Sequence, residues 1–177
     1  GLYASIDEYP AAFANVARPF DERLAALNVE LNATYVAFGA AGQRGRANQA
    51  EQDGNAAAMS PSAAASRTVS KAGALYRADW DLVDAVQSGK ALADIPAAEL
   101  PAELQALEPE QRDAWVREKT ERRQEVQQRI GELAAARGGY IAEQSTEKSG
   151  ATGLDAAILE GLREVAATKG FSFASDE

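Results

Sequence analysis

Residues 109–147 read PEQRDAWVREKTERRQEVQQRIGELAAARGGYIAEQSTE, and this stretch decides the fold. Helix-forming residues fill it, and only three glycines interrupt it. Its apolar residues recur every three or four positions, which is the spacing of one narrow stripe along a helix. The stripe comprises Trp115, Val116, Val126, Ile130, Leu133, Ala134, the stem of Arg137, Tyr140 and Ile141. A continuous helix here would extend about 55 Å, so it must lie along other helices of the chain or along a partner.

The charged residues of the same stretch alternate in sign. They are Arg117, Glu118, Lys119, Glu121, Arg122, Arg123, Glu125, Arg129 and Glu132. This mixture is typical of a solvated helix face with ion pairs at four-residue spacing. We therefore expect the whole set to lie on the solvated face.

Composition excludes several classes of protein. The net charge of −9 over 177 residues argues against nucleic-acid binding, which needs a basic face, and against binding to an anionic membrane surface. No apolar run approaches the length of a membrane-spanning helix. The chain has neither Cys nor His, which removes disulfides, thiolate zinc sites and the commonest general base. The absence of an initial Met and of a signal peptide predicts a piece of a larger precursor.

Upstream of residue 109 the sequence predicts shorter helices. Pro19 to Asp21 opens one whose apolar face is formed by Phe20, Leu24, Leu27 and Leu31. Residues 32–39 (NATYVAFG) form a dense apolar patch that fits either a strand or a helix end in the core. Residues 44–59 predict a second helix, and Ser62 is the expected N-cap of a third that reaches about Tyr76.

Two motifs in this region suggest chemistry only weakly. The spacing of Gly39, Gly42 and Gly45 could be mistaken for a phosphate loop, but it lacks the strand–loop–helix context and the Lys-Ser/Thr ending. We therefore interpret it as a turn. Asn32-Ala33-Thr34 matches the glycosylation sequon, which matters only in a eukaryotic secretory pathway.

Serine and lysine lie together at Ser66, Ser70 and Lys71. Such residues can form a nucleophile–base pair. Adjacent residues on a helix do not face each other, however, and no oxyanion loop accompanies this pair. We expect ordinary surface residues here.

Residues 79–89 (DWDLVDAVQSG) predict a short helix with Asp79 as its cap and Gly89 as its end. Its apolar face comprises Trp80, Leu82, Val83 and Val86. Asp79, Asp81 and Asp84 are the only compact acidic cluster that could hold a divalent cation. A solvated face with a cap is the favoured interpretation, so we predict no metal, cofactor or catalytic residue in this chain.

The fold expected is mainly α. It is an antiparallel helical bundle with one long protruding helical hairpin, and a short N-terminal strand could be added at residues 1–7. The hairpin forms when a last helix, about residues 154–169, folds back along the long one. The predicted parts are a remnant of a preceding domain at residues 1–18, a bundle of short helices at 19–107 and the long hairpin at 108–177.

Several stretches between Pro19 and Phe173 carry a family resemblance. They are Leu27-Asn28, Leu31-Asn32-x-Thr34-Tyr35, Asn48-Gln49, Asp53 with Asn55, Ser70-Lys71 and Trp80-Asp81-Leu82-Val83-Asp84. In these the chain resembles the helical C-terminal region of bacterial von Willebrand factor type A (VWA) domain proteins. The resemblance implies adhesion or protein binding outside the cytoplasm, with residues 1–7 as the last VWA strand. The Asp-x-Ser-x-Ser metal motif of VWA domains does not occur in the chain, so none of its ligands can be transferred.

The function expected is therefore a non-enzymatic scaffold that binds a protein partner or its own upstream VWA domain, in the periplasm or secreted. The alternative is a self-associating coiled-coil protein unrelated to VWA proteins. Glycine interruptions and an irregular stripe argue against that alternative. An enzyme would have to rely on carboxylates or on Ser and Lys, and no such constellation specifies a reaction.

Overall fold

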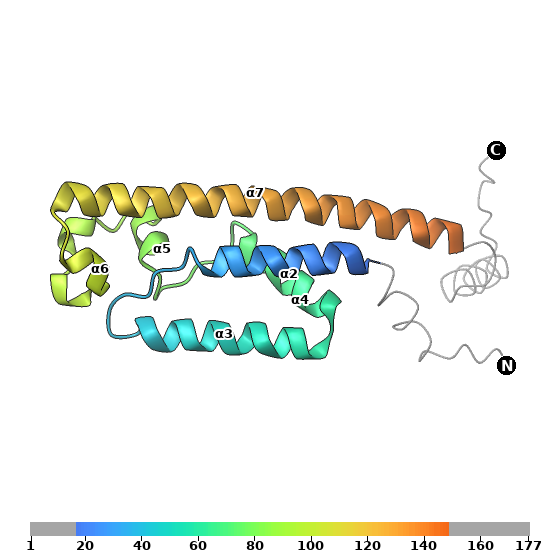
Figure 1. Ribbon diagram of the computed structural model, residues 1–177, viewed down its shortest axis with the longest axis horizontal. Helices are drawn as coiled ribbons and strands as arrows, with labels where there is room; N and C mark the ends of the chain where they lie inside the picture. Colours follow the sequence, from blue (N-terminus) through green and yellow to red (C-terminus); the bar gives the residue numbers. More distant parts are fainter. Residues whose placement is uncertain (1–16, 149–177) are drawn as a thin grey trace, which may run out of the picture. The chain divides into compact units, whose positions relative to one another are not determined.

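The computed structural model describes residues 17–148, and this part of the chain is mainly helical (Figure 1). Its α-helices are α2 (Arg18–Asn32), α3 (Gly42–Met59), α4 (Pro61–Ala72), α5 (Leu82–Gln87), α6 (Ala102–Gln105) and α7 (Pro109–Lys148). Two 3-10 helices, η2 (Leu92–Asp94) and η3 (Ala97–Glu99), lie between α5 and α6. The prediction of a mainly α helical bundle is thus confirmed. The expected strand at 1–7 and the returning helix at 154–169 lie outside the described residues.

Residues 17–137 form one compact unit, which includes most of α7. The described residues 138–148 at the end of α7 lie outside this unit. The three-part division at residues 18 and 107 stays a prediction.

Helix α2 runs antiparallel to α7 within the compact unit. Asp21, near the start of α2, bonds Arg137, and Glu30, near its end, bonds Arg129. Pro19 lies in the first turn of α2, where a missing N–H costs nothing, as the sequence predicts. The predicted leucine face of α2 is buried against Val126, Ile130 and Leu133 of α7.

Helix α4 packs on α2, and α3 packs on α4. Helix α3 runs antiparallel to α2, and α4 follows α2 in direction, because Ser62 lies at the Asp21 end of the bundle and Lys71 at the Asn32 end. The N-cap of α4 is Ser60, whose hydroxyl accepts from the N–H of Ala63. The predicted cap at Ser62 is wrong, because Pro61 occupies the first turn and leaves Ser60 as the residue outside the helix.

Residues 33–41 join α2 to α3 with a turn at each end and an extended segment at residues 35–38, where an antiparallel bridge pairs Ala37 with Asp81. The C=O of Val36 accepts from the N–H of Leu82, and the N–H of Phe38 donates to the C=O of Trp80. Gly39 has a φ of 66°, which an L side chain rarely adopts, so this glycine makes the turn into α3. The turn interpretation holds for Gly39, whereas Gly42 and Gly45 lie in α3.

The apolar side chains form two clusters rather than one. The first joins α2, α4 and the middle of α7, and it includes Leu24, Leu31 and Ile130. The second joins the extended segment, α5, the 3-10 helices and the start of α7, and it includes Phe38, Leu82 and Val116. Helix α7 contributes to both clusters, so it holds the two halves of the unit together.

Helix α3 contains a glycine that tertiary packing requires. A Cβ at Gly45 would lie 2.1 Å from Cγ of Trp80 and 2.7 Å from its Cβ, far inside van der Waals contact. Gly54, in the same helix, has nothing within 4 Å of such an atom. One glycine therefore allows close packing, and the other only weakens the helix.

We expect Gly45→Ala to lower the free energy of unfolding by about 1–3 kcal/mol, because Trp80 must move. Gly54→Ala is the matched control and should raise it by about 0.5–1 kcal/mol, since alanine favours the helix. Urea unfolding followed by circular dichroism measures both. Equal stabilisation by the two substitutions would contradict the packing of Trp80 on α3.

Candidate functional site

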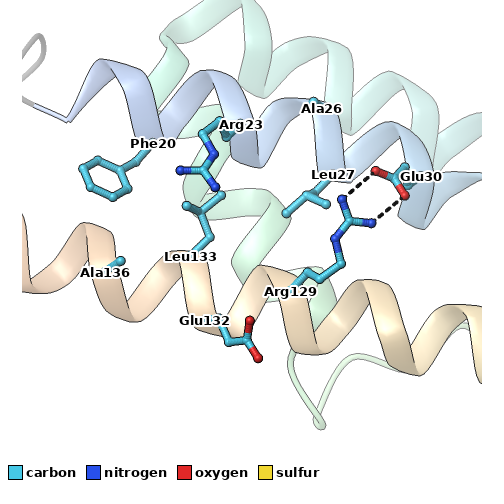
Figure 2. Close-up of a pocket in the computed structure, with 9 residues that line it drawn as sticks. All are labelled: Phe20, Arg23, Ala26, Leu27, Glu30, Arg129, Glu132, Leu133 and Ala136. Carbon is cyan, nitrogen blue, oxygen red and sulfur yellow. Dashed lines mark hydrogen bonds and ion pairs between the residues drawn. The ribbon is translucent and has the colours of Figure 1, made fainter.

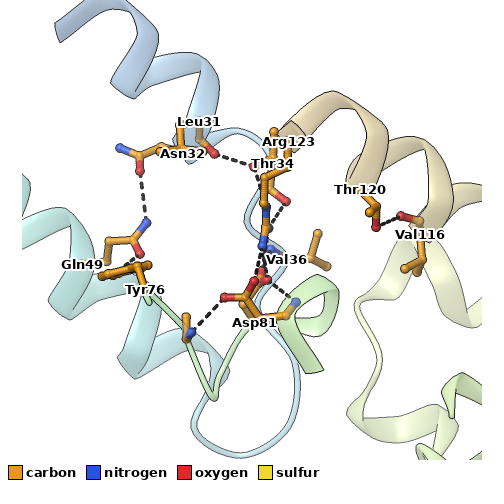
Figure 3. A network of polar contacts seen from close by, with 12 residues as sticks. Leu31, Asn32, Thr34, Val36, Gln49, Tyr76, Asp81, Val116, Thr120 and Arg123 are labelled. Carbon is orange, nitrogen blue, oxygen red and sulfur yellow. Dashed lines mark hydrogen bonds and ion pairs between the residues drawn. The ribbon is translucent and has the colours of Figure 1, made fainter. Parts of the chain in front are cut away.

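The first buried polar network is centred on Arg123 of α7, which is 2% exposed. Its Nη1 donates to Asp81 Oδ2 at 2.7 Å and to Asp84 Oδ1 at 2.9 Å. Its Nη2 donates to the C=O of Thr34 at 2.7 Å, and its Nε donates to the Thr34 hydroxyl at 3.0 Å. The guanidinium also lies 4.3 Å from the ring centroid of Tyr35. Arg123 therefore connects α7 to α5 and to the extended segment that follows α2 (Figure 3).

The two carboxylates of this network have further partners. Asp81 is the N-cap of α5 and accepts from the N–H of Asp84 at 2.8 Å and from the N–H of Val36. Asp84 accepts from the N–H of Ala78 at 2.8 Å. Burial raises the pKa of Asp84, and the bonds from Ala78 and Arg123 oppose that rise. Both carboxylates thus serve to fix backbone segments.

These positions correct the prediction of a solvated acidic face. Asp79 is exposed as expected, but Asp81 is fully buried and Asp84 is 7% exposed. The cap of α5 is Asp81 rather than Asp79, because the bridge to Ala37 holds Asp81 in the extended conformation that a cap needs. Within residues 17–148 no group of three His, Cys, Asp or Glu side chains is arranged to hold a metal ion.

The second network is centred on Lys71 of α4, which is 1% exposed. Its Nζ donates to Asp53 Oδ2 at 2.6 Å, to Asn32 Oδ1 at 2.6 Å and to Asn28 Oδ1 at 2.9 Å. Burial lowers the pKa of Lys71, and the bond to Asp53 opposes this effect. Arg67 donates to the other oxygen of Asp53 at 2.6 Å. The expectation that Lys71 is a surface residue is wrong, whereas Ser66 and Ser70 are exposed.

Asn32 is the most connected amide of the second network. Its Nδ2 donates to Asp53 Oδ2 at 2.8 Å, and its Oδ1 also accepts from Gln49 Nε2 at 3.1 Å. The hydroxyl of Tyr76 donates to Gln49 Oε1 at 2.9 Å (Figure 3). The amide nitrogen that a glycosylation sequon would require is therefore bonded inside the bundle.

Tyr35 lies between the two networks and joins them. Its buried ring has the Arg123 guanidinium at 4.3 Å and the Lys71 ammonium at 5.9 Å, measured to the centroid. Tyr76 and Trp80 pack around the same ring at 6.3 and 5.6 Å. Burial raises the pKa of the Tyr35 hydroxyl, so it stays neutral at ordinary pH.

Sequence reasoning missed Arg123 and Lys71, although their spacing contained a signal. Arg123 follows Val116 by seven residues and precedes Val126 by three, so it occupies the apolar stripe of α7. Lys71 follows the buried Thr68 by three residues. Asn28 and Asn32 in α2, and Gln49 and Asp53 in α3, are pairs four residues apart. Such polar pairs at helical spacing indicate a polar face that meets another helix.

A shallow groove of about 430 Å³ runs between α2 and α7 on the outer side of the bundle (Figure 2). Leu27, Leu133, Ala26 and Ala136 line its apolar part. Glu30 crosses one end and accepts from both Nη atoms of Arg129, at 2.8 and 3.1 Å. The hydrogen bond from Arg129 lowers the pKa of Glu30 below its ordinary 4.5.

Comparison of the chain with protein-family models, curated proteins and solved structures finds no match. The resemblance to VWA proteins therefore remains a prediction.

We expect Arg123→Ala to lower the free energy of unfolding by about 3–5 kcal/mol, because Asp81 and Asp84 would stay buried without a counter-charge. Arg122→Ala, at the residue directly before Arg123, is the matched control. Arg122 is half exposed and pairs with Glu30 and Glu125, so its loss should cost no more than about 1 kcal/mol. Urea unfolding measures both variants. A similar small cost for the two would contradict the buried network.

We expect Arg129→Gln to raise the pKa of Glu30 towards 4.5, since the hydrogen bond from Arg129 is the main cause of its lowering. In the wild-type protein this pair stabilises the fold fully above pH 4.5, and the stabilisation is lost as pH falls through the lower folded-state pKa. Carboxyl NMR titration measures the shift. Arg23→Gln, on the rim of the same groove, is the control and should leave the titration of Glu30 unchanged.

Proposed function

We propose that the chain is a non-enzymatic helical scaffold that binds a protein partner, as the tail of a VWA-domain adhesion-type protein located outside the cytoplasm. The observation that supports this function best is that the buried charged side chains connect the helices of the bundle. Lys71, Arg123 and Asp81 each bond to groups on other segments of the bundle, so their charges fix helices to one another. Such interactions favour one rigid arrangement of α7.

The burial of the α7 stripe favours this proposal over a self-associating rod. Val126 and Ile130 are 0% exposed within a single chain, because α2 and α4 cover them. A coiled-coil dimer would need these same positions at its interface. Along residues 109–137 the stripe is already occupied, and α7 presents its charged face outward.

The groove between α2 and α7 offers a surface for a partner. Its apolar part is exposed at Ala26 and Ala136, and charged side chains surround it. None of the helices described is long and apolar enough to cross a membrane. The net charge of −9 makes an acidic nucleic acid an unfavourable partner, so we propose a protein.

The scaffold function is tested with a photo-crosslinking amino acid at Ala26 or Ala136 in the protein expressed in its source cells. We expect one specific heterologous adduct, or an intramolecular adduct to an upstream domain of the same protein. Ala50, exposed on α3, is the control position and should give no specific adduct. Light scattering of the purified chain should give a monomer mass at all concentrations. Adducts only to a second copy, with a mass that rises with concentration, would establish the rod instead.

A further inference from the structure

The Lys71 network places a buried amine against two side-chain amides and a carboxylate. Lys71 comes from α4, Asn32 from α2, and Asp53 and Gln49 from α3, so three helices meet there. The scaffold role uses these residues only as ionic and hydrogen-bonding groups. The chemistry of these groups also allows a covalent reaction between them.

We propose that Lys71 and Asn32 form an intramolecular isopeptide bond, with Asp53 as the acid–base group and Gln49 as the donor to the reacting carbonyl. The bond would join α4 covalently to α2. Because the chain has no Cys, it cannot be cross-linked by a disulfide. The reaction occurs once per molecule and needs neither a cofactor nor an oxidant.

The nucleophile is the Lys71 amine, which acts as a nucleophile once it has lost a proton. Its side chain is fully buried, and Nζ lies 2.6 Å from Asp53 Oδ2, so the proton has a direct acceptor. The same nitrogen lies 2.6 Å from Asn32 Oδ1, and the Asn32 Cγ is one covalent bond beyond that oxygen. Fixed proximity of this kind replaces a bimolecular encounter with an intramolecular one.

The geometry favours Asn32 over Asn28 as the acceptor. Only the Asn32 carbonyl has a second donor, Gln49 Nε2 at 3.1 Å, which can stabilise negative charge as it develops on Oδ1. Tyr76 fixes the orientation of Gln49 through its Oε1. Asn28 Oδ1 accepts from Lys71 at the longer distance of 2.9 Å.

The atoms and charges of the step balance. The Lys71 ammonium gives one proton to Asp53, and the neutral Nζ then forms a bond to Cγ of Asn32. Asp53 returns its proton to Asn32 Nδ2, which lies 2.8 Å from Oδ2, and takes a second proton from Nζ. The Cγ–Nδ2 bond breaks and Nδ2 leaves as ammonia, which removes the last proton from Asp53 as ammonium. One amide bond is exchanged for another, without oxidation or reduction.

The test is the intact mass of the purified wild-type chain, fresh and after incubation at alkaline pH. We expect the mass to fall below the sequence value by one ammonia molecule, about 17 Da. Tandem mass spectrometry of a tryptic digest should show residues 24–44 linked to residues 68–77, with no cleavage after Lys71. A full mass under both conditions overturns the proposal. So does an ammonia loss located in one unlinked peptide, because that indicates a succinimide.

Variants separate the roles of the residues. Lys71→Arg keeps a cation but not a nucleophilic amine, and Asn32→Ala removes the acceptor, so both should retain the full mass. Lys90→Arg changes an exposed lysine that follows the end of α5, so it is the control and should still lose ammonia. Asn28→Ala should also lose ammonia, and failure there would overturn the choice of Asn32. Since the wild-type spectrum decides by itself, a variant that does not fold leaves the test intact.

Discussion

The bidentate contact of Arg123 with two buried aspartates is the interaction on which the rest of the unit depends. Taking three charges out of water is costly, and the cost is recovered only when every charge has partners. Arg123 meets this condition with Asp81, Asp84 and Thr34, and the carboxylates meet it with backbone N–H groups. The position of α7 therefore determines where α5 and the extended segment can lie.

The two apolar clusters would be poorly specified without this contact. Alanine is common in the chain, and alanine buries little surface, so hydrophobic packing alone would tolerate several helix registers. Arg123 lies on α7 between Val116 of one cluster and Val126 of the other. Lys71 has the same effect among α2, α3 and α4. Polar networks here select one register, while leucine, valine and isoleucine supply most of the burial.

This arrangement bears directly on function. A rigid bundle held by internal ion pairs is suited to presenting a surface at a fixed angle rather than to changing shape on binding. The proposed isopeptide bond between α4 and α2 would make that arrangement permanent. The scaffold proposal and the isopeptide proposal depend on the same observation. In each, buried cations of the bundle face inward and are paired with buried or partly buried carboxylates.

Much of the fold could be predicted from local pattern. The start of α7 at Pro109, the leucine face of α2 and the helix at residues 44–59 follow from helical spacing and from proline geometry. Local pattern does not predict the environment of a charged side chain that can be either solvated or buried. A charge is usually solvated, so the pattern places Arg123 and Lys71 in solvent. Either Asp79 or Asp81 could cap α5, so the pattern does not distinguish them.

The sequence by itself therefore determined the helical class, the length of α7 and which residues carry the apolar faces. These properties depend on interactions within a few residues along the chain. Only the tertiary structure decided which charges are buried, because Arg123 meets Asp81 across 42 residues and Lys71 meets Asn28 across 43. Burial of a charge depends on a partner from another helix, and local spacing can place a charge on a buried face but does not show which partner it meets.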